Sequence, residues 1–298
     1  MPLLAIAVGV SMAVAASAVV LAVGDRGSGA DGEESASTSV GASEKGPTSF
    51  EWEVIGVYKA IESMTADDPT PDVVDATLDQ LEMYADEAPS SERTQELYLK
   101  GLRVAAYYAE EEEDAARSLE LHARFVEHAA GYLHFERVAL EAMRLRVQHL
   151  QQDCGSRPGE VAELESLAAR FPESDRAIYT HLGGLAAAIS DDCLSSTELR
   201  FWTDRLIEMS LRHLDLPEGR WHLRIAIDRR FFSEIESGDL DAAEVAMLPV
   251  VEQLDRFPND FAAAYANWLH VLENAARAEG DVARADRIQE RRRLRESG

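Results

Sequence analysis

The chain has 298 residues, 46% of them hydrophobic and 7% aromatic, and its formal net charge is −26 at pH 7. A surface this acidic repels nucleic acid backbones and anionic lipid headgroups, which argues against both as partners. A chain of this length can hold two ordinary domains or one continuous array of repeats.

The N-terminus contains a long uncharged segment. Leu3 to Val23 carries no charge over 21 residues, and as a helix it would span about 31 Å, one bilayer core. A cleaved signal peptide could use the small residues 16–18 as its cleavage site, but the usual basic segment before the apolar stretch is missing. An uncleaved anchor explains the full length better, so residues 1–23 are predicted to be a transmembrane anchor or a signal peptide. Both interpretations place the rest of the chain on the extracytoplasmic, periplasmic side.

Residues 24–49 are predicted to be a flexible linker. They are rich in Gly, Ser, Ala and Glu, contain no aromatic residue and show no periodic apolar face. A random coil of this length reaches roughly 25–30 Å, enough to clear the lipid headgroups.

From Phe50 onward, apolar residues recur at helical spacing and helix breakers fall at regular intervals. Pro172, Pro217 and Pro258 stand 45 and 41 residues apart, and Pro89 lies 83 residues before Pro172, about two periods. Each proline is predicted to end a helical pair. The expected pairs are Phe50–Met64 with Pro71–Ala85, Glu92–Ala109 with Asp114–Ala129, Leu133–Gln151 with Gly159–Arg170, Asp175–Ser190 with Thr197–Leu214, Arg220–Ser237 with Leu240–Arg256, and Phe261–Glu279 with Val282–Arg295.

Two short motifs repeat at a similar interval. Gly-Asp at 238–239 recurs at 280–281, 42 residues later, and Arg-Phe-Pro at 170–172 recurs at 256–258, 86 residues later. A fixed period in this range is typical of stacked helical pairs, each too small to bury its own apolar face. Residues 50–298 are therefore predicted to form an all-α solenoid of about six helix-turn-helix repeats with a period near 42.

Two features inside the predicted helices have structural interpretations. Pro249 interrupts the helix that starts at Leu240 and predicts a kink near Val245–Leu248. Gly183 and Gly184 lie in an apolar helical run, where close packing between helices is the expected cause.

The last three repeats resemble the tetratricopeptide repeat family, whose helical hairpins stack into a right-handed superhelix. Tyr179-x2-Leu182-Gly183 is similar to the aromatic-x2-Leu-Gly of that family's first helix, and residues 238–243 and 280–285 are similar to its inter-helix turn. The family period is about 34 residues against about 42 here, and a difference of about eight equals roughly two helical turns. The resemblance implies that partner segments lie in a concave groove along the first helix of each hairpin.

Counting from Tyr179 and from the two Gly turns carries this groove onto eight residues. They are Trp221, Arg224, Asp228, Phe231 and Phe232 in the fifth repeat and His270, Glu273 and Asn274 in the sixth. Adjacent aromatics beside an Arg/Asp pair suit the anchoring of a peptide or helix. Phe231 and Phe232 could equally fill the interface to the neighbouring hairpin.

The sequence contains no motif for catalysis, metal binding or cofactor binding. HExxH, CxxC, GxSxG, a Walker loop and GxGxxG are all absent, and the eight histidines are scattered. We therefore expect no enzyme activity, no metal and no cofactor.

The expected partner is another protein of the cell envelope or of a membrane complex, with residues 3–23 in the membrane. The alternative is a structural spacer or homo-oligomer. The basic run at 291–295 sits in the last helical turns, where cations meet the negative end of the helix dipole. That run is expected to finish the solenoid, although in the alternative it would contact the acidic body of another copy.

The two cysteines, Cys154 and Cys193, are 39 residues apart, and each lies in a turn between the two helices of a hairpin. Equivalent turns of adjacent hairpins lie about 8–10 Å apart, and flexible turns can close this to the roughly 5.5–6 Å between Cα atoms that a disulfide needs. In an exported domain this pattern predicts a disulfide, worth roughly 3–4 kcal/mol in the chain-entropy model. The alternative is two free thiols in a cytoplasmic protein.

Overall fold

The computed structural model of this protein describes residues 49–64, 71–152, 155–190 and 194–296. All of them belong to the compact unit that runs from Pro47 onward. The regular structure in these residues is entirely helical, as the apolar periodicity predicts. The helices are α1 (Ser49–Met64), α2 (Pro71–Glu87), α3 (Glu92–Glu111), α4 (Ala115–Tyr132), α5 (Glu136–Gln152), α6 (Arg157–Ala168), α7 (Asp175–Ile189), α8 (Ser196–Arg212), α9 (Pro217–Ser237), α10 (Leu240–Ala246), α11 (Leu248–Val251), α12 (Pro258–Ala278) and α13 (Val282–Glu296).

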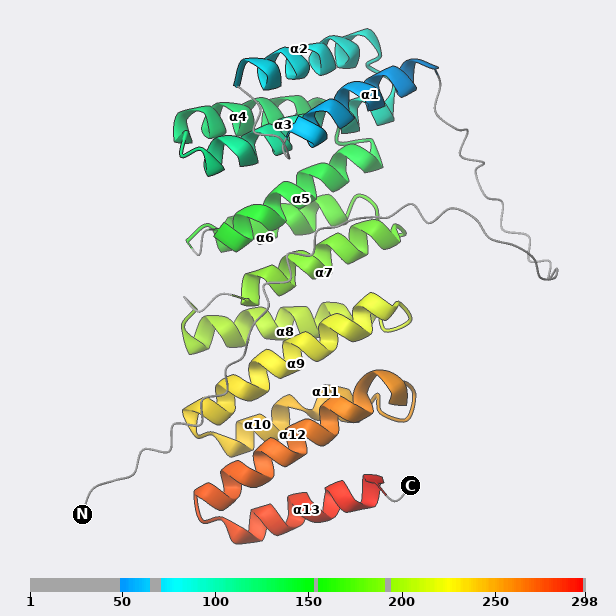
Figure 1. The fold of residues 1–298 in the computed structure, drawn as a ribbon. Helices are drawn as coiled ribbons and strands as arrows, with labels where there is room; N and C mark the ends of the chain where they lie inside the picture. Colours follow the sequence, from blue (N-terminus) through cyan, green and yellow to red (C-terminus); the bar gives the residue numbers. More distant parts are fainter. Residues whose placement is uncertain (1–48, 65–70, 153–154, 191–193, 297–298) are drawn as a thin grey trace, which may run out of the picture. The chain divides into compact units, whose positions relative to one another are not determined.

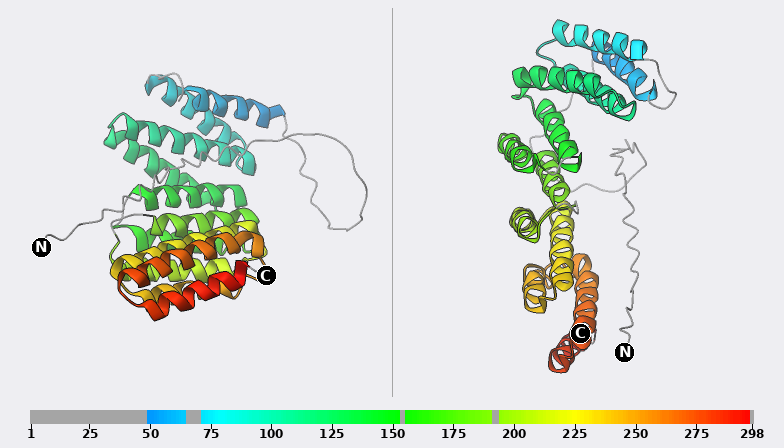
Figure 2. Two further views of the ribbon diagram at one scale, coloured as in Figure 1. Left: turned by 60° about the horizontal axis from the view of Figure 1, so that its bottom comes forward. Right: turned by 90° about the vertical axis from the view of Figure 1, so that its left-hand side faces the viewer.

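Consecutive helices pack as pairs (Figure 1). The first helices of the pairs are α1, α3, α5, α7, α9 and α12, and each contacts the next first helix along the chain. The second helices are α2, α4, α6, α8, the two-part α10–α11 and α13. In the described residues they pack closely against first helices, whereas second helices of neighbouring pairs are linked through long side chains. The side view in Figure 2 accordingly shows α6, α8 and α10 on one side of α5, α7 and α9.

The predicted helix boundaries are confirmed to within about three residues, except at the end of the fifth pair. One detail of the prediction is wrong. Pro217 and Pro258 do not end helices but occupy the first turn of α9 and α12. Proline is favoured there because the N–H that it lacks would have no acceptor within the helix. These two prolines therefore mark where the fifth and sixth pairs begin.

The second helix of the fifth pair is broken, as Pro249 predicts. α10 ends at Ala246, and α11 begins at Leu248 with the proline in its first turn. The proline ring clashes with the carbonyl four residues earlier and offers no N–H to it. The continuous helix predicted up to Arg256 is therefore wrong, since α11 ends at Val251.

Three turns between a first and a second helix share one backbone geometry. Gly238 and Gly280 have positive φ angles of 77° and 84°, and each precedes an aspartate that caps the next helix. Glu113 has the same left-handed backbone, with φ of 60°, before the capping residue Asp114. In the three turns the aspartate N–H donates to the carbonyl five residues earlier, at 3.0, 2.9 and 2.8 Å. The acidic segment between α3 and α4 is thus a third copy of the Gly-Asp turn.

Side-chain contacts between successive pairs repeat the sequence period. Arg117 on α4 bonds Asp75 on α2 at 2.6 Å, and Arg124 bonds Glu82 at 2.9 Å, both across 42 residues. These bonds bring equivalent positions of neighbouring pairs together. Other bonds that span 40 to 43 residues include Arg205–Glu165, Arg256–Asp215, Arg220–Asp260, Trp268–Asp228 and Arg284–Asp241.

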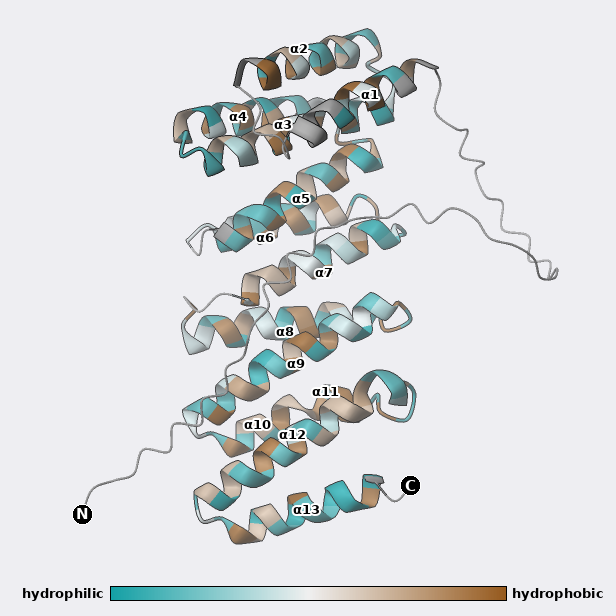
Figure 3. Ribbon diagram, viewed as in Figure 1, coloured by the Kyte–Doolittle hydropathy of each residue, from teal (hydrophilic) through white to brown (hydrophobic). Residues whose placement is uncertain are grey.

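Hydrophobic and hydrophilic residues are interspersed along each helix (Figure 3), and the buried hydrophobic ones form one cluster mainly within α1–α8 and another mainly within α9–α13. Close packing explains why position 184 is a glycine, but it does not explain the glycine at position 183. A Cβ at Gly184 would lie 2.1 Å from Leu164 Cδ2 and 3.2 Å from Val147 Cγ2, whereas one at Gly183 would meet nothing within 4 Å. The close helix approach predicted for the pair is therefore confirmed at Gly184 alone.

Candidate partner-binding face

Each first helix presents one stripe of side chains that the core does not bury. On α9 the stripe is formed by Trp221, Ile225, Asp228 and Phe232, whose spacing of three or four residues places them on one side of the helix. We call the combined stripes of α3, α5, α7, α9 and α12 the first-helix face. Equivalent positions about 42 residues away are Tyr179, Gly183 and Ala186 on α7 with its C-cap Ser190, and Ala263, Asn267, His270 and Asn274 on α12.

Two exposed aromatic residues mark the centre of this face. Tyr179 on α7 is 36% exposed and Trp221 on α9 is 49% exposed, and they are 42 residues apart. Both rings contact the buried His222, with centroid distances of 6.2 and 4.8 Å. Burial lowers the pKa of His222, and its Nδ1 lies 2.7 Å from the Glu218 carbonyl. His222 thus supports both rings on the side of the core, while their outer surfaces stay in water. Sequence reasoning selected Trp221 but not Tyr179, although the period relates them.

Phe231 does not lie on the first-helix face, and its selection as a surface anchor is corrected. The side chain is fully buried, and its ring centroid lies 5.3 Å from that of Phe232 and 6.3 Å from that of Trp268. The helical period places residue 231 toward α12, so it fills the interface between the fifth and sixth pairs. Phe232 is half-buried.

Asp228 is tied to the same interface. Its Oδ1 accepts a hydrogen bond from Trp268 Nε1 at 2.5 Å. Burial raises the pKa of Asp228, while the hydrogen bond from Trp268 and the nearby Arg224 oppose the rise. Asp228 therefore positions the buried indole and offers only part of its carboxylate to a ligand. Arg224 is half-buried beside it.

The three residues selected on α12 divide between two roles. His270 and Asn274 are exposed and lie 3.2 Å apart, from Nε2 to Nδ2. Glu273 is buried, and its carboxylate pairs with Arg277 at 3.1 Å and with Arg292 of α13 at 3.3 Å. Glu273 therefore joins α12 to α13, whereas the other two belong to the first-helix face.

A cluster of cations that sequence reasoning missed forms the α3–α5 part of the face. The partly exposed residues at helical spacing there are Arg93, Lys100 and Arg103 on α3 and Arg137 and Arg144 on α5. The carboxylate of Glu141 on α5 has no exposed surface, and Arg144 pairs with it. Lys100 Nζ and Arg103 Nε on α3 lie 3.8 and 3.4 Å from its oxygens. A carboxylate so completely buried requires such partners.

Glu96 on α3 holds the rest of the cluster. It pairs with Arg93 at 2.7 Å, with Lys100 at 2.8 Å and with Arg137 of α5 at 3.3 Å. Burial alone would raise the pKa of Glu96, but Lys100 and Arg93 outweigh it and lower that pKa. Five cationic side chains, each 20–33% exposed, thus surround two buried carboxylates. This part of a chain with net charge −26 is locally basic.

The described residues contain no group of three or more His, Cys, Asp or Glu side chains that could hold a metal ion. The most perturbed histidine, His181 on α7, is buried, and burial lowers its pKa to about 4 despite the nearby Glu165. A neutral, buried imidazole of this kind is a core residue.

A scan against protein-family models, a search of curated proteins and a search of solved structures each return no match. The likeness to tetratricopeptide repeats therefore rests on the residues and on the packing of neighbouring helices.

Other predictions concern residues that the structure does not describe. Cys154, Cys193, the segment Leu3–Val23 and most of the linker at 24–49 lie outside the described residues. Among the helices that are described, none is long and apolar enough to cross a membrane.

Proposed function

We propose that this protein is a membrane-tethered scaffold that binds a segment of another envelope protein along its first-helix face, without catalysis. In this proposal the helical pairs form a right-handed solenoid like that of tetratricopeptide repeats. Leu3–Val23 anchors the chain, and residues 50–298 lie on the extracytoplasmic side. One observation carries the proposal. Tyr179 and Trp221 occupy equivalent positions on adjacent first helices and keep 36% and 49% of their surface exposed.

The chemistry of the face indicates what kind of segment would bind. Large aromatic side chains held rigidly at a surface are favoured anchors in protein interfaces. Tyr179, Trp221 and Phe232 would take apolar side chains. The cations around Glu96 and Glu141 would take carboxylates, since they are already partly desolvated and fixed in place. The proposed partner segment is therefore apolar over α7–α9 and acidic over α3–α5.

Site-specific photo-crosslinking tests the proposal, because it captures whichever protein lies against a chosen position. A photoreactive residue replaces Trp221, Tyr179 or Arg103 in the full chain, expressed in the cells that make it and irradiated in intact membranes. The control position is Phe201 on α8, which is 51% exposed but belongs to a second helix. We expect one crosslinked protein species from the three positions of the first-helix face and none from the control. Equal labelling at all four positions, or none at any, would reject this face as the binding site.

A substitution gives an independent measure of the same contact. Trp221→Ala should weaken capture of the crosslinked protein by about tenfold or more, as expected when a central aromatic anchor is lost. Phe201→Ala should leave capture unchanged. Deletion of Leu3–Val23 tests the anchor separately, because it should release the chain from membranes without changing its affinity for the purified partner.

A further inference from the structure

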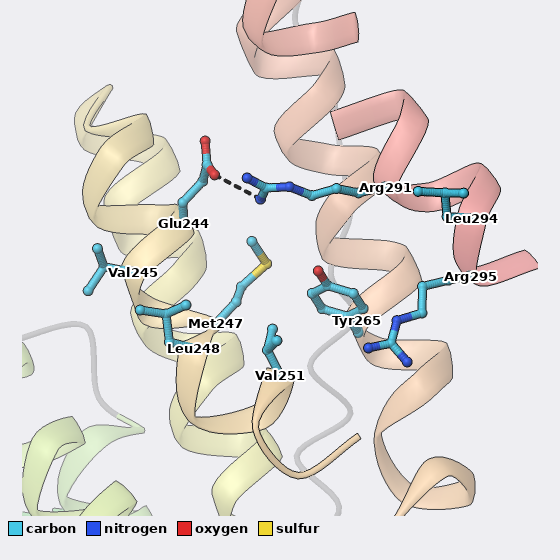
Figure 4. A pocket seen from close by; sticks show the side chains of 9 residues that line it. All are labelled: Glu244, Val245, Met247, Leu248, Val251, Tyr265, Arg291, Leu294 and Arg295. Carbon is cyan, nitrogen blue, oxygen red and sulfur yellow. Dashed lines mark hydrogen bonds and ion pairs between the residues drawn. The ribbon is translucent and has the colours of Figure 1, made fainter. Parts of the chain in front are cut away.

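The second helices carry an apolar cavity that the proposed function does not use. Its volume is about 820 Å³, and it lies where the broken α10–α11 faces α12 and α13 (Figure 4). Val245 and Leu248 line one side, Leu294 lines the other, and Tyr265 lies between them. Val245, Leu248 and Leu294 are 62%, 50% and 65% exposed. Three large apolar side chains exposed around one cavity are typical of a surface that another helix covers.

Arginines of α13 form the rim of the cavity. Arg291 pairs with Glu244 at 3.0 Å (Figure 4), and Arg295 pairs with Asp255 at 3.4 Å. Both side chains are about half exposed, at 51% and 53%. Ion pairs this exposed contribute little to stability, so these arginines can exchange their present partners for other carboxylates. α13 as a whole has six arginines and three carboxylates in a chain of net charge −26.

α2, the second helix of the first pair, has the complementary properties. Its 17 residues include six carboxylates and no Lys, Arg or His. Val73 and Met83 are 43% and 48% exposed, and they lie ten residues apart with the exposed Ala76 on the same side of the helix. By helical spacing the exposed Asp79 and Asp86 lie together along one side of this stripe, and the exposed Gln80 lies within it. α2 thus presents a second stripe with exposed apolar residues, bordered on one side by carboxylates, besides the one it buries.

We propose that a second copy of this chain fills the cavity, with the exposed stripe of α2 from one copy lying between α10–α11 and α13 of the next. Val73 and Met83 would cover Leu248 and Leu294, while Asp79 and Asp86 would face Arg291 and Arg295. One surface belongs to the first helical pair and the other to the fifth and sixth pairs, so the contact is head-to-tail and can propagate from copy to copy. It does not depend on the first-helix face, and either proposal can fail without the other.

Sedimentation velocity of the purified full chain in detergent tests the contact. We expect concentration-dependent association that weakens by about tenfold or more between roughly 50 and 500 mM salt, because opposite charges meet at the rim. Leu294→Asp should weaken association at least tenfold. The matched control is Leu119→Asp on α4, another exposed leucine at 70%, which should change it less than twofold. Both leucines are largely exposed, so neither variant should lose its fold, which circular dichroism checks.

A charge exchange identifies α2 as the occupant. One variant carries Asp79→Lys and Asp86→Lys, and the other carries Arg291→Glu and Arg295→Glu. Each alone should be monomeric, since like charges then face each other. Their mixture should associate again, because the basic α2 of the first fits the acidic rim of the second, and the unchanged surfaces fit as well.

Three results would overturn the proposal. The first is a wild-type chain that stays monomeric at low salt up to its solubility limit. The second is association that Leu294→Asp and the arginine substitutions leave unchanged. The third is a heterologous protein that crosslinks at position 294 of a monomeric chain, which would assign the cavity to a different partner.

Discussion

The contact between α3 and α5 and the contact between α9 and α12 occupy equivalent places, yet different chemistry holds them. Glu96 and Glu141 lie buried between α3 and α5 among cations. Between α9 and α12 lie the rings of Phe231 and Trp268, with one hydrogen bond from the indole to Asp228. The period thus fixes where first helices meet, but not which groups meet there. A charged interface is tolerated at such a position because each buried carboxylate has several partners.

The largest effect is expected from a variant that breaks the apolar contact between α9 and α12. Phe231→Ala should lower the free energy of unfolding by about 3–5 kcal/mol, because it leaves a cavity against Trp268. Phe232→Ala, which removes a half-buried ring, should cost about 1–2 kcal/mol. Urea denaturation followed by circular dichroism measures both. Equal losses for the two variants would contradict the assignment of Phe231 to the core.

A smaller loss in the free energy of unfolding is expected when the charged contact between α3 and α5 is broken. Glu141→Gln keeps the shape of the side chain but removes the charge that three cations face, and we expect a loss of about 2–3 kcal/mol. The control is Glu208→Gln on α8, whose carboxylate is 66% exposed beside Arg212, with an expected change below about 0.5 kcal/mol. Since Glu141 is buried, its effect should persist in about 1 M salt. A loss that salt abolishes would indicate a solvated pair instead.

Acid should weaken the helices that lie between these two contacts. Burial lowers the pKa of His181 from 6.5 to about 4. The unfolded state therefore binds a proton more readily than the folded one, and the free energy of unfolding falls as the pH drops from about 7 toward 4. For this residue alone the loss at pH 5 is about 2 kcal/mol. His181→Leu should remove that part of the pH dependence, measured as the difference between the two stability profiles. Parallel profiles would show that His181 does not titrate in this range.

The smallest expected effects come from substitutions in two equivalent turns, the one before α4 and the one before α10. Glu113→Gly should raise the free energy of unfolding by about 1 kcal/mol, because a left-handed backbone disfavours any residue with a Cβ. Gly238→Ala, at the equivalent place, should lower it by about 1 kcal/mol. Thermal denaturation of the two variants should therefore shift the midpoint in opposite directions.

The sequence predicted the helices well because their signals are local. Apolar spacing, helix-breaking prolines and the Gly-Asp turns each depend on a few neighbouring residues, and together they located the helix ends within about three residues outside the α10–α11 break. The left-handed turn at Glu113 was not predicted, because a glutamate there gives no local sign of a left-handed backbone. Its spacing could have revealed it, since Asp114 lies 125 residues before Asp239, about three periods.

The candidate face was harder to predict, because a shift of one position along a helix decides whether a side chain lies in the core or on the surface. Phe231 and Phe232 differ by about 100° around the helix axis, so a count from a distant motif could not separate them. Glu141 lay in an ordinary amphipathic pattern, and nothing in its own helix shows that Lys100 and Arg103 would face it. Pairs of unlike charge one period apart, such as Asp75 and Arg117, were a usable signal that the sequence did contain.

The extensive helix contacts described above join only helices of the same or adjacent pairs, and this has a consequence for how the chain reaches its native state. Little chain entropy is lost before such contacts form, so folding can nucleate within any two neighbouring pairs and spread outward. The same locality governs unfolding, because an end pair such as α12–α13 has neighbours on one side only. Amide exchange should therefore be fastest at the ends and slowest around α5 to α9, with a graded profile in place of one cooperative value.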